Sequence, residues 1–566
     1  MTINERSRKS WLAPCAALLG FCVVASPVRA APMEAETTPA ASPSILGIWR
    51  ALAPPKAPRS SGLLELRISA TESGELRVSV LDQMRYLFGP MDVALKRDAE
   101  RYRAAFEHYF MPEAFGFTSG PVSLVAKLLP SGDRLEVGFA DRTRRWNLIY
   151  RRANDPSFKK YDTPRLDGAG QAVTQYGYRV PVTTEMKTAE AAAVGVRVEP
   201  IEHMVRAVLE GRQRYRDSLL VVTDGKLILE EYFYGFERDR LHTLMSITKS
   251  VTGLIIGTNV AEGKFDIERP IVEYFPEYPD SPWRRADRRV TSEQLMRMAD
   301  VLGWGDNTAG NTKSVELEPG MPRLERDALF MQGLFMPDLP GWLLAQTPLP
   351  DRPNSFYLYN TMYTQLTSAA LARATGAKLR EEVARRLLEP LGERDWDYFA
   401  FPGAAAQTYA ESVPAAGSGL MLRPLALAKY GVMVSDCGRW NGRQLFPADW
   451  IARSATLRSI APDRSDDGYG YNWELYKVLS QPDGQVHWVT GHTGHGGQAL
   501  YIVPDYGLVF VTTSFDFDFE SKENEKDLLL KHLLPAVAPP GTTFVPAHIL
   551  PQDLHTAPLA RCASSR

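Results

Sequence analysis

Cysteine is scarce in this sequence, and its scarcity excludes two classes of protein. Only four cysteines occur among 566 residues, and Cys15 and Cys22 lie in an N-terminal segment that we expect to be removed. The remaining pair, Cys437 and Cys562, is too small for a disulfide-dense scaffold or a cysteine-rich zinc site. The sequence leaves open whether these two cysteines pair.

The sequence also lacks a large excess of either charge and, beyond the N-terminus, any long apolar run. The formal net charge is −2 and no long basic run occurs, so we expect neither nucleic acid nor an anionic membrane as a partner. Beyond the N-terminus no stretch is apolar enough over about 20 residues to span a bilayer. With 44% hydrophobic and 23% charged residues, the composition is that of a globular protein, and its length predicts at least two domains.

The first 30 residues have the three-part layout of a secretory signal peptide. Basic residues at positions 6, 8 and 9 precede an apolar run that begins at Trp11, and small residues follow at Ala30 and Ala31. A membrane anchor is the alternative, but the run is short and Pro14 interrupts it. We therefore predict a signal peptide over residues 1–30 and a periplasmic or secreted protein with no stable membrane span after signal removal. Residues 31–44, rich in Ala, Pro and Thr, are predicted to form a flexible leader.

Residues 45–154 have the alternating pattern of short β-strands. Apolar side chains alternate with polar ones, and turn residues such as Ser73-Gly74 separate the stretches. The alternating stretches are residues 64–68, 76–80, 122–129, 135–139 and 146–150. The pattern predicts a small antiparallel β-barrel or sandwich. Its Gly47-x-Trp49 opening loosely resembles lipocalin-like barrels, which would bind a lipophile.

Sheet and helix signals are segregated in the remainder of the chain. Residues 155–200 are polar and are predicted to be a linker with a wrapping segment. The next domain, 201–538, opens with strands around Asp224-Gly225 and ends with strands around residues 504–507, with helical patterns between them. Thr291 and Gln294 are spaced as a helix capping box. The Pro-rich tail, 539–566, is predicted to be extended or loosely packed.

Ser246 and Lys249 form the first chemical motif. Three residues apart on a helix, they project from one face about a turn apart. A serine hydroxyl becomes an effective nucleophile when a base takes its proton, and a lysine serves as that base if burial lowers its pKa. The flanking apolar residues, including Ile247 and Val251, predict such burial. A second Ser-x-x-Lys, Ser157 to Lys160, lies in the polar linker and lacks this setting.

Two further motifs follow in the order that such chemistry requires. Residues 357–361, Tyr-Leu-Tyr-Asn-Thr, provide a phenol that a lysine ammonium could draw toward phenolate for proton transfer. Residues 491–498, Gly-His-Thr-Gly-His-Gly-Gly-Gln, place glycines at a strand where a substrate can approach the backbone. Histidines 487, 492 and 495 could instead hold a metal, but no His-Glu-x-x-His helix or carboxylate cluster accompanies them. We therefore predict no metal and no organic cofactor.

The ordered motifs resemble those of the serine β-lactamase/penicillin-recognition superfamily, especially its esterase and 6-aminohexanoate-dimer hydrolase-like branch. The likeness covers roughly residues 200–535. The resembling segments are Leu219 to Lys226, Ser246 to Val251, Ile271 to Pro276, Gly417 to Leu420, Gly438 to Gly442, Pro447 to Trp450 and Gly494 to Gln498. The resemblance implies an α+β fold in which helices flank an antiparallel sheet and a helical subdomain is added.

The resemblance also implies residue roles. Ser246 would be the acylated nucleophile, Lys249 its proton partner and Tyr359 the second-motif tyrosine, with Tyr357 as the fallback. The family pattern of Tyr-x-Asn or Tyr-x-Ser places Thr361 at a substrate-contact position.

Members with Lys-Thr-Gly in the third motif align that triplet with His492, Thr493 and Gly494, and His495 would then supply an oxyanion-hole amide. These four residues are accordingly assigned to substrate binding. A neutral His492 would hold a β-lactam carboxylate weakly, so any β-lactam turnover is expected to rise as protonation sets in toward about pH 6.

The predicted function is that of an exported serine hydrolase acting on a small-molecule ester, amide or peptide-like substrate through an acyl-enzyme. Within the same chemistry, a β-lactamase and a D-amino-acid peptidase or carboxypeptidase on cell-wall fragments are alternatives. A non-catalytic penicillin-recognition-like binding protein is the alternative of another class.

Overall fold

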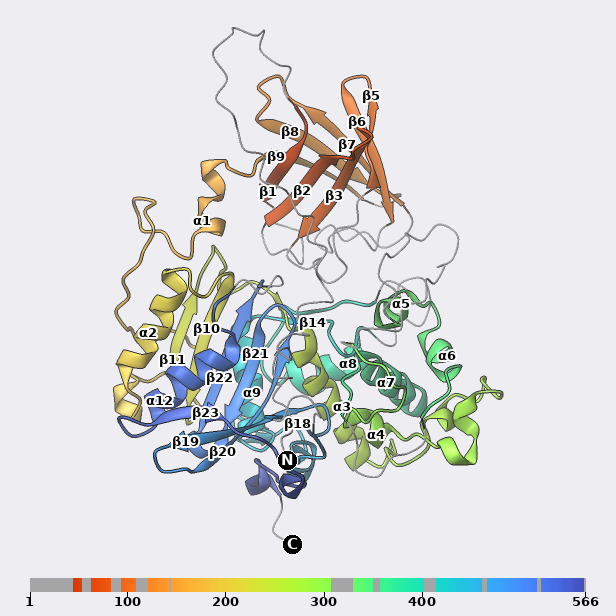
Figure 1. Cartoon of the computed structure of the whole chain (residues 1–566), viewed down its shortest axis with the longest axis vertical. Coiled ribbons are helices and arrows are strands. Elements are labelled where there is room, and N and C mark those ends of the chain that lie inside the picture. Colours follow the sequence, from red (N-terminus) through yellow and green to blue (C-terminus); the bar gives the residue numbers. More distant parts are fainter. Residues whose placement is uncertain are drawn as a thin grey trace, which may run out of the picture.

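The chain forms a β domain followed by a larger α+β domain (Figure 1). The computed structural model describes residues 44–52, 63–82, 93–107, 121–142, 144–306, 329–349, 357–401, 414–460, 466–516 and 521–563. The predicted signal peptide and nearly all of the predicted leader lie outside these residues. The predicted α+β class is therefore confirmed for the part that the structure describes.

The N-terminal domain is one nearly closed, barrel-like antiparallel sheet, drawn in red and orange in Figure 1. Its strand order is β4-β3-β2-β1-β9-β8-β7-β6-β5. The strands are β1 (Gly47–Leu52), β2 (Leu63–Ala70), β3 (Leu76–Asp82), β4 (Val93–Ala94), β5 (Lys96–Asp98), β6 (Arg101–Glu107), β7 (Pro121–Leu128), β8 (Arg134–Ala140) and β9 (Arg145–Arg152). The predicted alternation is present: Leu64, Leu66 and Ile68 of β2 point inward and are buried.

Large side chains fill the interior of this β domain. Trp49, Phe139 and Tyr150 are fully buried among aliphatic residues from the neighbouring strands. The domain therefore has a packed hydrophobic core of its own, formed by the inward-facing positions of its strands.

Residues 155–200, which we call the strap, do not behave as a free linker. They include α1 (Lys159–Asp162), and farther on the chain runs beside β11 (Lys226–Tyr232), where Thr188 pairs with Leu227. Glu231, almost fully buried, accepts hydrogen bonds from Arg179 and from Tyr176 and forms an ion pair with Arg165. The predicted wrapping segment is thus fastened to the second domain by buried charge.

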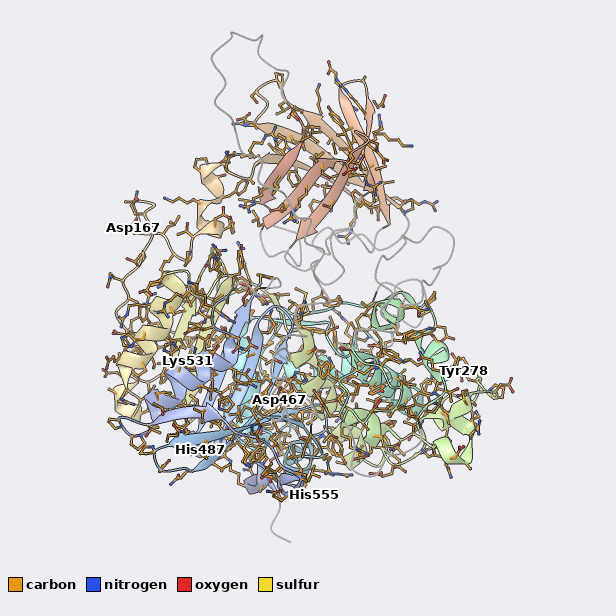
Figure 2. The ribbon with its side chains drawn as sticks, viewed as in Figure 1. Asp167, Tyr278, Asp467, His487, Lys531 and His555 are labelled. Atoms are coloured by element: carbon orange, nitrogen blue, oxygen red, sulfur yellow. A yellow bond between two sulfur atoms is a disulfide. The ribbon has the colours of Figure 1, made fainter. Side chains whose placement is uncertain are left out.

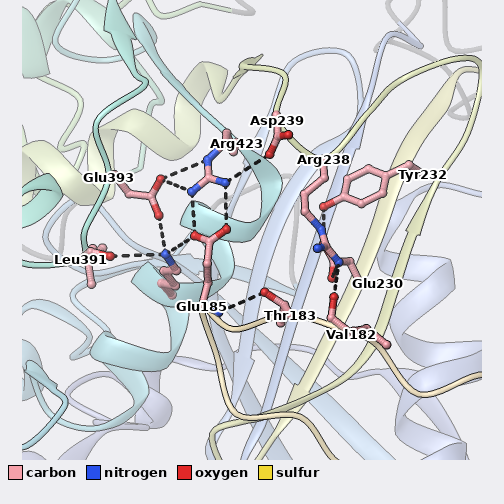
Figure 3. A network of polar contacts seen from close by, with 11 residues as sticks. Val182, Thr183, Glu185, Glu230, Tyr232, Arg238, Asp239, Leu391, Glu393 and Arg423 are labelled. Atoms are coloured by element: carbon pink, nitrogen blue, oxygen red, sulfur yellow. Dashed lines mark hydrogen bonds and ion pairs between the residues drawn. The ribbon is translucent and has the colours of Figure 1, made fainter.

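A second ionic cluster fastens the strap farther along (Figure 3). Glu185 pairs with Arg423, at 2.8 Å, and with Lys429, at 2.7 Å. The same two cations contact Glu393, whose side chain is fully buried. Hydrogen bonds from Arg423, followed by Lys429, lower the pKa of Glu185 to about 2.

The second domain is built on a continuous antiparallel sheet with the order β11-β10-β22-β21-β20-β19-β18-β17. Its strands are β10 (Arg216–Thr223), β11 (Lys226–Tyr232), β17 (Ser459–Ile460), β18 (Asp467–Tyr469), β19 (Glu474–Gln481), β20 (Val486–Gly494), β21 (Gln498–Val503) and β22 (Leu508–Ser514). Both predicted hairpins are confirmed. The first and last ones join at β10 and β22, so the yellow and blue strands lie side by side in Figure 1.

Helices cover both faces of this sheet, because both faces of its central strands are apolar. Leu219 and Val221 of β10 pack toward α2 and α12, whereas Leu220 and Val222 pack toward α3 and α9. The helices are α2 (Val198–Leu209), α3 (Thr248–Ala261), α4 (Ser292–Met296), α5 (Leu329–Phe335), α6 (Leu339–Leu344), α7 (Thr361–Thr375), α8 (Leu379–Val383), α9 (Pro424–Ser435), α10 (Ala448–Ser454), α11 (Glu525–Leu528) and α12 (Leu534–Val537). In Figure 1, α3 separates the sheet from a helical subdomain that contains α5 to α8. The predicted capping box is also present, with Thr291 and Gln294 bonding reciprocally at the start of α4.

The C-terminal tail differs from its prediction. Residues Thr543–Pro546 form β23, which pairs with β19 and extends the sheet. Cys562 is buried and bonded to Cys437, with the two Cα atoms 5.0 Å apart. Because the tail supplies a strand and a disulfide, it is an integral part of the second domain rather than a loose end.

Among the described residues, no helix has both the length and the apolar character needed to cross a membrane.

Candidate active site

Ser246 lies at a sharp entry into α3. β12 (His242–Thr243) pairs with β14 (Leu420–Leu422), and a short 3₁₀ turn then leads into the helix. Met245, buried and directly before the serine, has a φ of 47°, in the left-handed region that non-glycine residues rarely adopt. Such strain is characteristic of functional sites, and here it leaves Ser246 half-exposed between buried neighbours.

Lys249 is fully buried at the base of this turn. Its Nζ lies 2.9 Å from each of three oxygens, namely Ser246 Oγ, Thr361 Oγ1 and the Gly417 carbonyl. Burial lowers the pKa of Lys249 to about 8, and the charges of Asp306 and Glu474 offset only part of that effect. The structure therefore brings the predicted serine and lysine together, and about one amine in ten is neutral at pH 7.

Tyr359 is the tyrosine that lies against this pair. Lys249 Nζ sits 4.7 Å from the centre of its ring. Its buried hydroxyl makes no hydrogen bond of regular geometry among the described residues, although Ser246 lies near enough to lower the pKa of the phenol. Burial, followed by the charges of Glu474 and Asp306, nevertheless holds that pKa well above 10. This direction opposes the predicted drift toward phenolate and favours the neutral phenol at neutral pH.

The fallback tyrosine has a different environment. Tyr357 pairs with Ala299 through a β-bridge, and its ring lies 5.4 Å from that of Tyr469. The structure thus places Tyr359 beside Lys249 and Tyr357 in an aromatic layer next to it.

The Thr361 side chain lies between Lys249 and Asp306. This first residue of α7 is buried, and its Oγ1 contacts Lys249 on one side and the carboxylate of Asp306 on the other. The Thr361 backbone N–H also donates to Asp306, at 2.8 Å. Substrate contact was predicted for this residue, but its hydroxyl is occupied by these two partners.

The third motif closes the site from β20. Gly494 lies so near the nucleophile turn that a Cβ there would be 2.5 Å from the Leu244 carbonyl oxygen, so the position requires glycine. His492 is fully buried and its Nδ1–H donates to the Thr493 carbonyl at 2.8 Å, so its Nε2 accepts from Tyr469 at 3.2 Å.

Burial lowers the pKa of His492 despite Glu474 nearby. This direction opposes the predicted protonation toward pH 6 and favours the neutral imidazole. Burial opposes the ionisation of Glu474, but the proximity of His492 and hydrogen bonds from Tyr476 and Thr493 outweigh it and lower the pKa of this carboxyl.

His495 begins the turn after β20. Burial lowers the pKa of its ring to about 4, and its carbonyl accepts from Gln498 at 3.2 Å. Gln498 also bonds both backbone groups of Ser514 on β22. The turn that carries the predicted oxyanion amide is therefore tied to the central sheet.

The three histidines are spread along β20 and the turn that follows it. His487, labelled in Figure 2, binds Asp505 and Ser480 near the start of β20, whereas His492 and His495 lie five and eight residues farther on. At about 3.3 Å per residue, the first gap is on the order of 16 Å. No cluster of three or more metal-ligating side chains occurs among the described residues.

Sequence reasoning missed three groups of this site. Asp306 and Glu474 are single carboxylates without a spacing signal, and the Gly417 carbonyl is a backbone group. Gly417 lies in one of the segments that carry the family resemblance, but the resemblance assigned it no role.

Comparison with known proteins assigns the second domain to a family. A family model described as Beta-lactamase matches residues 201–533, more than half of the chain, and the chain therefore belongs to the beta-lactamase family. The predicted family and the β-lactamase/transpeptidase-like fold are confirmed.

Two named relatives are similar over shorter stretches. The chain is 30% identical over 103 residues to a 6-aminohexanoate-dimer hydrolase from Paenarthrobacter ureafaciens, covering 18% of this chain and 25% of that protein. It is 27% identical over 179 residues to Esterase EstB from Burkholderia gladioli, covering 31% of this chain and 43% of the esterase. Both names agree with the prediction of a serine hydrolase. The chain thus spans less than half the length of the curated relatives it matches.

A solved structure is also similar. A penicillin-binding protein homologue from Caulobacter crescentus is 17% identical, with a TM-score of 0.42, over 59% of this chain and 93% of that one.

Proposed function

We propose that this protein is an exported serine hydrolase that cleaves an uncharged ester or amide through an acyl-enzyme on Ser246. The observation that carries the proposal is the 2.9 Å contact between Ser246 Oγ and a buried Lys249 whose pKa is about 8. Such a lysine is neutral often enough near pH 7 to 8 to remove the serine proton.

The first step is attack on the substrate carbonyl. The Lys249 lone pair takes the Ser246 proton while Oγ bonds to the carbonyl carbon, and the carbonyl electron pair moves onto its oxygen. The backbone N–H groups of Ser246, before α3, and of His495, in the tied turn, are the proposed donors to this oxyanion.

The second step is departure of the leaving group. Tyr359, a neutral phenol beside Lys249, donates its proton to the leaving oxygen or nitrogen and regains one from the lysine ammonium. The two transfers are coupled, with the Lys249 ammonium supplying a proton as the phenol gives up its own, so no free phenolate accumulates, in agreement with the raised pKa of the phenol. Water then attacks the acyl-enzyme by the same proton route in reverse, releasing the acid and restoring Ser246.

The proposed substrate class follows from the charge around the site. His492 is neutral and rests against ionised Glu474, so no fixed cation is present where related enzymes would hold a substrate carboxylate. Thr361 also has its hydroxyl occupied. An anionic β-lactam or a D-amino-acid peptide with a free carboxylate is therefore disfavoured relative to a neutral ester or linear amide.

Catalysis is favoured over binding without turnover. A non-catalytic member would not need the Ser246–Lys249 hydrogen bond or the burial that lowers the lysine pKa, and both are present.

Export is proposed from the N-terminal sequence and supported by the disulfide. Cys437 and Cys562 are the two cysteines that would remain after removal of residues 1–30, and they are joined. Structural disulfides persist mainly in oxidising compartments such as the periplasm.

The test is intact-mass spectrometry of protein exported from a bacterial host, before and after incubation with a fluorophosphonate. We expect an N-terminus near Ala31 and one adduct, which Ser246→Ala abolishes and the matched Ser157→Ala retains. Full-rate labelling of the Ser246→Ala variant would exclude the assigned nucleophile, and an intact Met1 would exclude processing.

The same preparation tests the substrate class. At pH 8, kcat/KM should be higher for p-nitrophenyl acetate than for a chromogenic cephalosporin, and lowering the pH toward 6 should not favour the cephalosporin. A cephalosporin preference would instead establish β-lactam hydrolysis.

A further inference from the structure

A carboxylate from outside the three motifs controls the hydroxyl next to Lys249. Asp306 follows Trp304-Gly305 and reaches the start of α7, where one carboxylate oxygen accepts from the Thr361 N–H and the other from the Thr361 hydroxyl. The same hydroxyl oxygen lies 2.9 Å from Lys249 Nζ. Three side chains therefore form a chain that ends at the proposed base.

The direction of each hydrogen bond in this chain is fixed by counting protons. A threonine hydroxyl has one proton, and when Asp306 is ionised its carboxylate can only accept, so it takes that proton. Thr361 Oγ1 can then offer Lys249 only a lone pair. The Gly417 carbonyl, 2.9 Å from the same nitrogen, also only accepts.

This arrangement determines where the lysine lone pair points. A neutral amine has two N–H bonds and one lone pair, and its two N–H bonds are taken by Thr361 and Gly417. The third contact of Lys249 Nζ is Ser246 Oγ, so the lone pair faces the serine proton.

We propose that Asp306 is a positioning residue that, through Thr361, orients the lone pair of neutral Lys249 toward Ser246. The inference rests on the proposed function and deepens it. The family pattern has an amide or a serine two residues after the tyrosine. Here a threonine stands at that position, and its hydroxyl pairs with the distant carboxylate of Asp306.

A purely structural role is the competing explanation. Because Thr361 is the first residue of α7, its N–H is one of the groups that a helix leaves unpaired, and Asp306 satisfies it. The two roles make different predictions for the hydroxyl proton, and this difference can be tested.

The key variant is Asp306→Asn, which retains an oxygen for the Thr361 N–H but replaces the other oxygen by a donating NH₂. The hydroxyl must then accept from that amide and donate to Lys249, which withdraws the lone pair from Ser246. We expect fluorophosphonate labelling of Ser246 to slow on the order of 10²-fold, as for a misplaced catalytic group.

Thr361→Val provides the decisive comparison. It removes the hydroxyl, so Lys249 loses one acceptor but no longer faces a donor, and labelling should slow only about tenfold. The double variant Asp306→Asn/Thr361→Val should label as fast as Thr361→Val and faster than Asp306→Asn. Asp300→Asn is the matched control, because Asp300 accepts a backbone N–H on the same loop, from Gly303 at 2.8 Å.

A second measurement does not depend on turnover. Lys249 faces Tyr359, Asp306, Glu474 and, less closely, His492. Removing the Asp306 charge should lower the Lys249 pKa, which ¹⁵N NMR of the labelled side-chain amine reports in the wild type and in Asp306→Asn.

The outcomes separate the two proposals. A double variant slower than Asp306→Asn, or a Lys249 pKa that Asp306→Asn does not change, would overturn the positioning role. Absence of labelling at Ser246 in the wild type, with a Lys249 pKa that still responds to Asp306→Asn, would overturn the hydrolase while leaving the electrostatic coupling of Asp306 to Lys249 intact. Thermal unfolding of every variant distinguishes loss of the α7 contact from loss of orientation.

Discussion

The acid limb of the pH–rate profile should report the ionisation of Lys249. In the proposed mechanism only the neutral amine accepts the Ser246 proton, so kcat/KM follows the neutral fraction of the free enzyme. The structure gives this lysine a pKa of about 8, set chiefly by burial.

The expected magnitude follows from that value. With a pKa of about 8, roughly one lysine in a hundred is neutral at pH 6, one in ten at pH 7 and nine in ten at pH 9. Activity should therefore rise about tenfold between pH 7 and pH 9 and about 90-fold between pH 6 and pH 9. Activity should rise with pH, because deprotonation of the Lys249 ammonium creates the base.

The two histidines and the tyrosine near the site should not distort this limb. The pKa of His495 is lowered to about 4 and that of His492 is also lowered, so neither should titrate as the pH rises above 7. The pKa of Tyr359 lies well above 10, so no alkaline decline is expected below pH 10.

The assay is initial-rate hydrolysis of p-nitrophenyl acetate from pH 6 to pH 9.5, with Ser246→Ala subtracted as the non-enzymatic background. Lys249→Met should abolish the limb together with the activity, because the two residues act as one unit. A profile already at its plateau at pH 7, or an inflection near 6.5 as for an ordinary histidine, would refute lysine as the base.

Three further predictions concern the surroundings of the site. Tyr359→Phe should reduce turnover on the order of 10²-fold and Tyr357→Phe much less. If steady-state kinetics show the reverse order, Tyr357 is the second-motif tyrosine. Glu185→Gln should lower the free energy of unfolding at pH 7 by on the order of 1 kcal/mol, allowing for solvent screening of a half-buried group. Since the folded pKa of Glu185 is depressed, this difference should shrink in denaturant titrations as the pH falls from about 4.5 toward 2, and a constant difference would exclude the ion pairs as its cause. Cys437→Ser together with Cys562→Ser should cost about 2–4 kcal/mol of stability without slowing Ser246 labelling, and slower labelling would link the tail to catalysis.

Local sequence signals predicted the parts of the fold whose physics is local. Alternation along β2, the turn at Asp224-Gly225 and the capping box at Thr291 each involve neighbours within a few residues, and the structure contains all three. Ser246 and Lys249 are likewise three residues apart, so one turn of backbone is enough to bring them together.

The remainder depended on contacts between distant residues. Asp306 is 55 residues from Thr361, and Gly417 is 168 residues from Lys249, so no spacing rule connects them. The strap was predicted to be a linker because it is rich in polar and charged residues. Glu185, which anchors it, contacts Arg423 only in the folded domain. The tail was misjudged for the same reason, since β23 gains its stability from β19.

The two departures from the family pattern share one physical feature. Thr361 stands where an amide or a serine is usual and pairs with Asp306. His492 stands where a lysine is common and rests against Glu474. Each departure therefore brings a carboxylate toward the nucleophile instead of an amide or a cation. Both carboxylates raise the pKa of Lys249, and burial must overcome them to leave it near 8. The charge of these two carboxylates is the reason why we propose a neutral ester or amide, rather than a β-lactam carboxylate, as the substrate class.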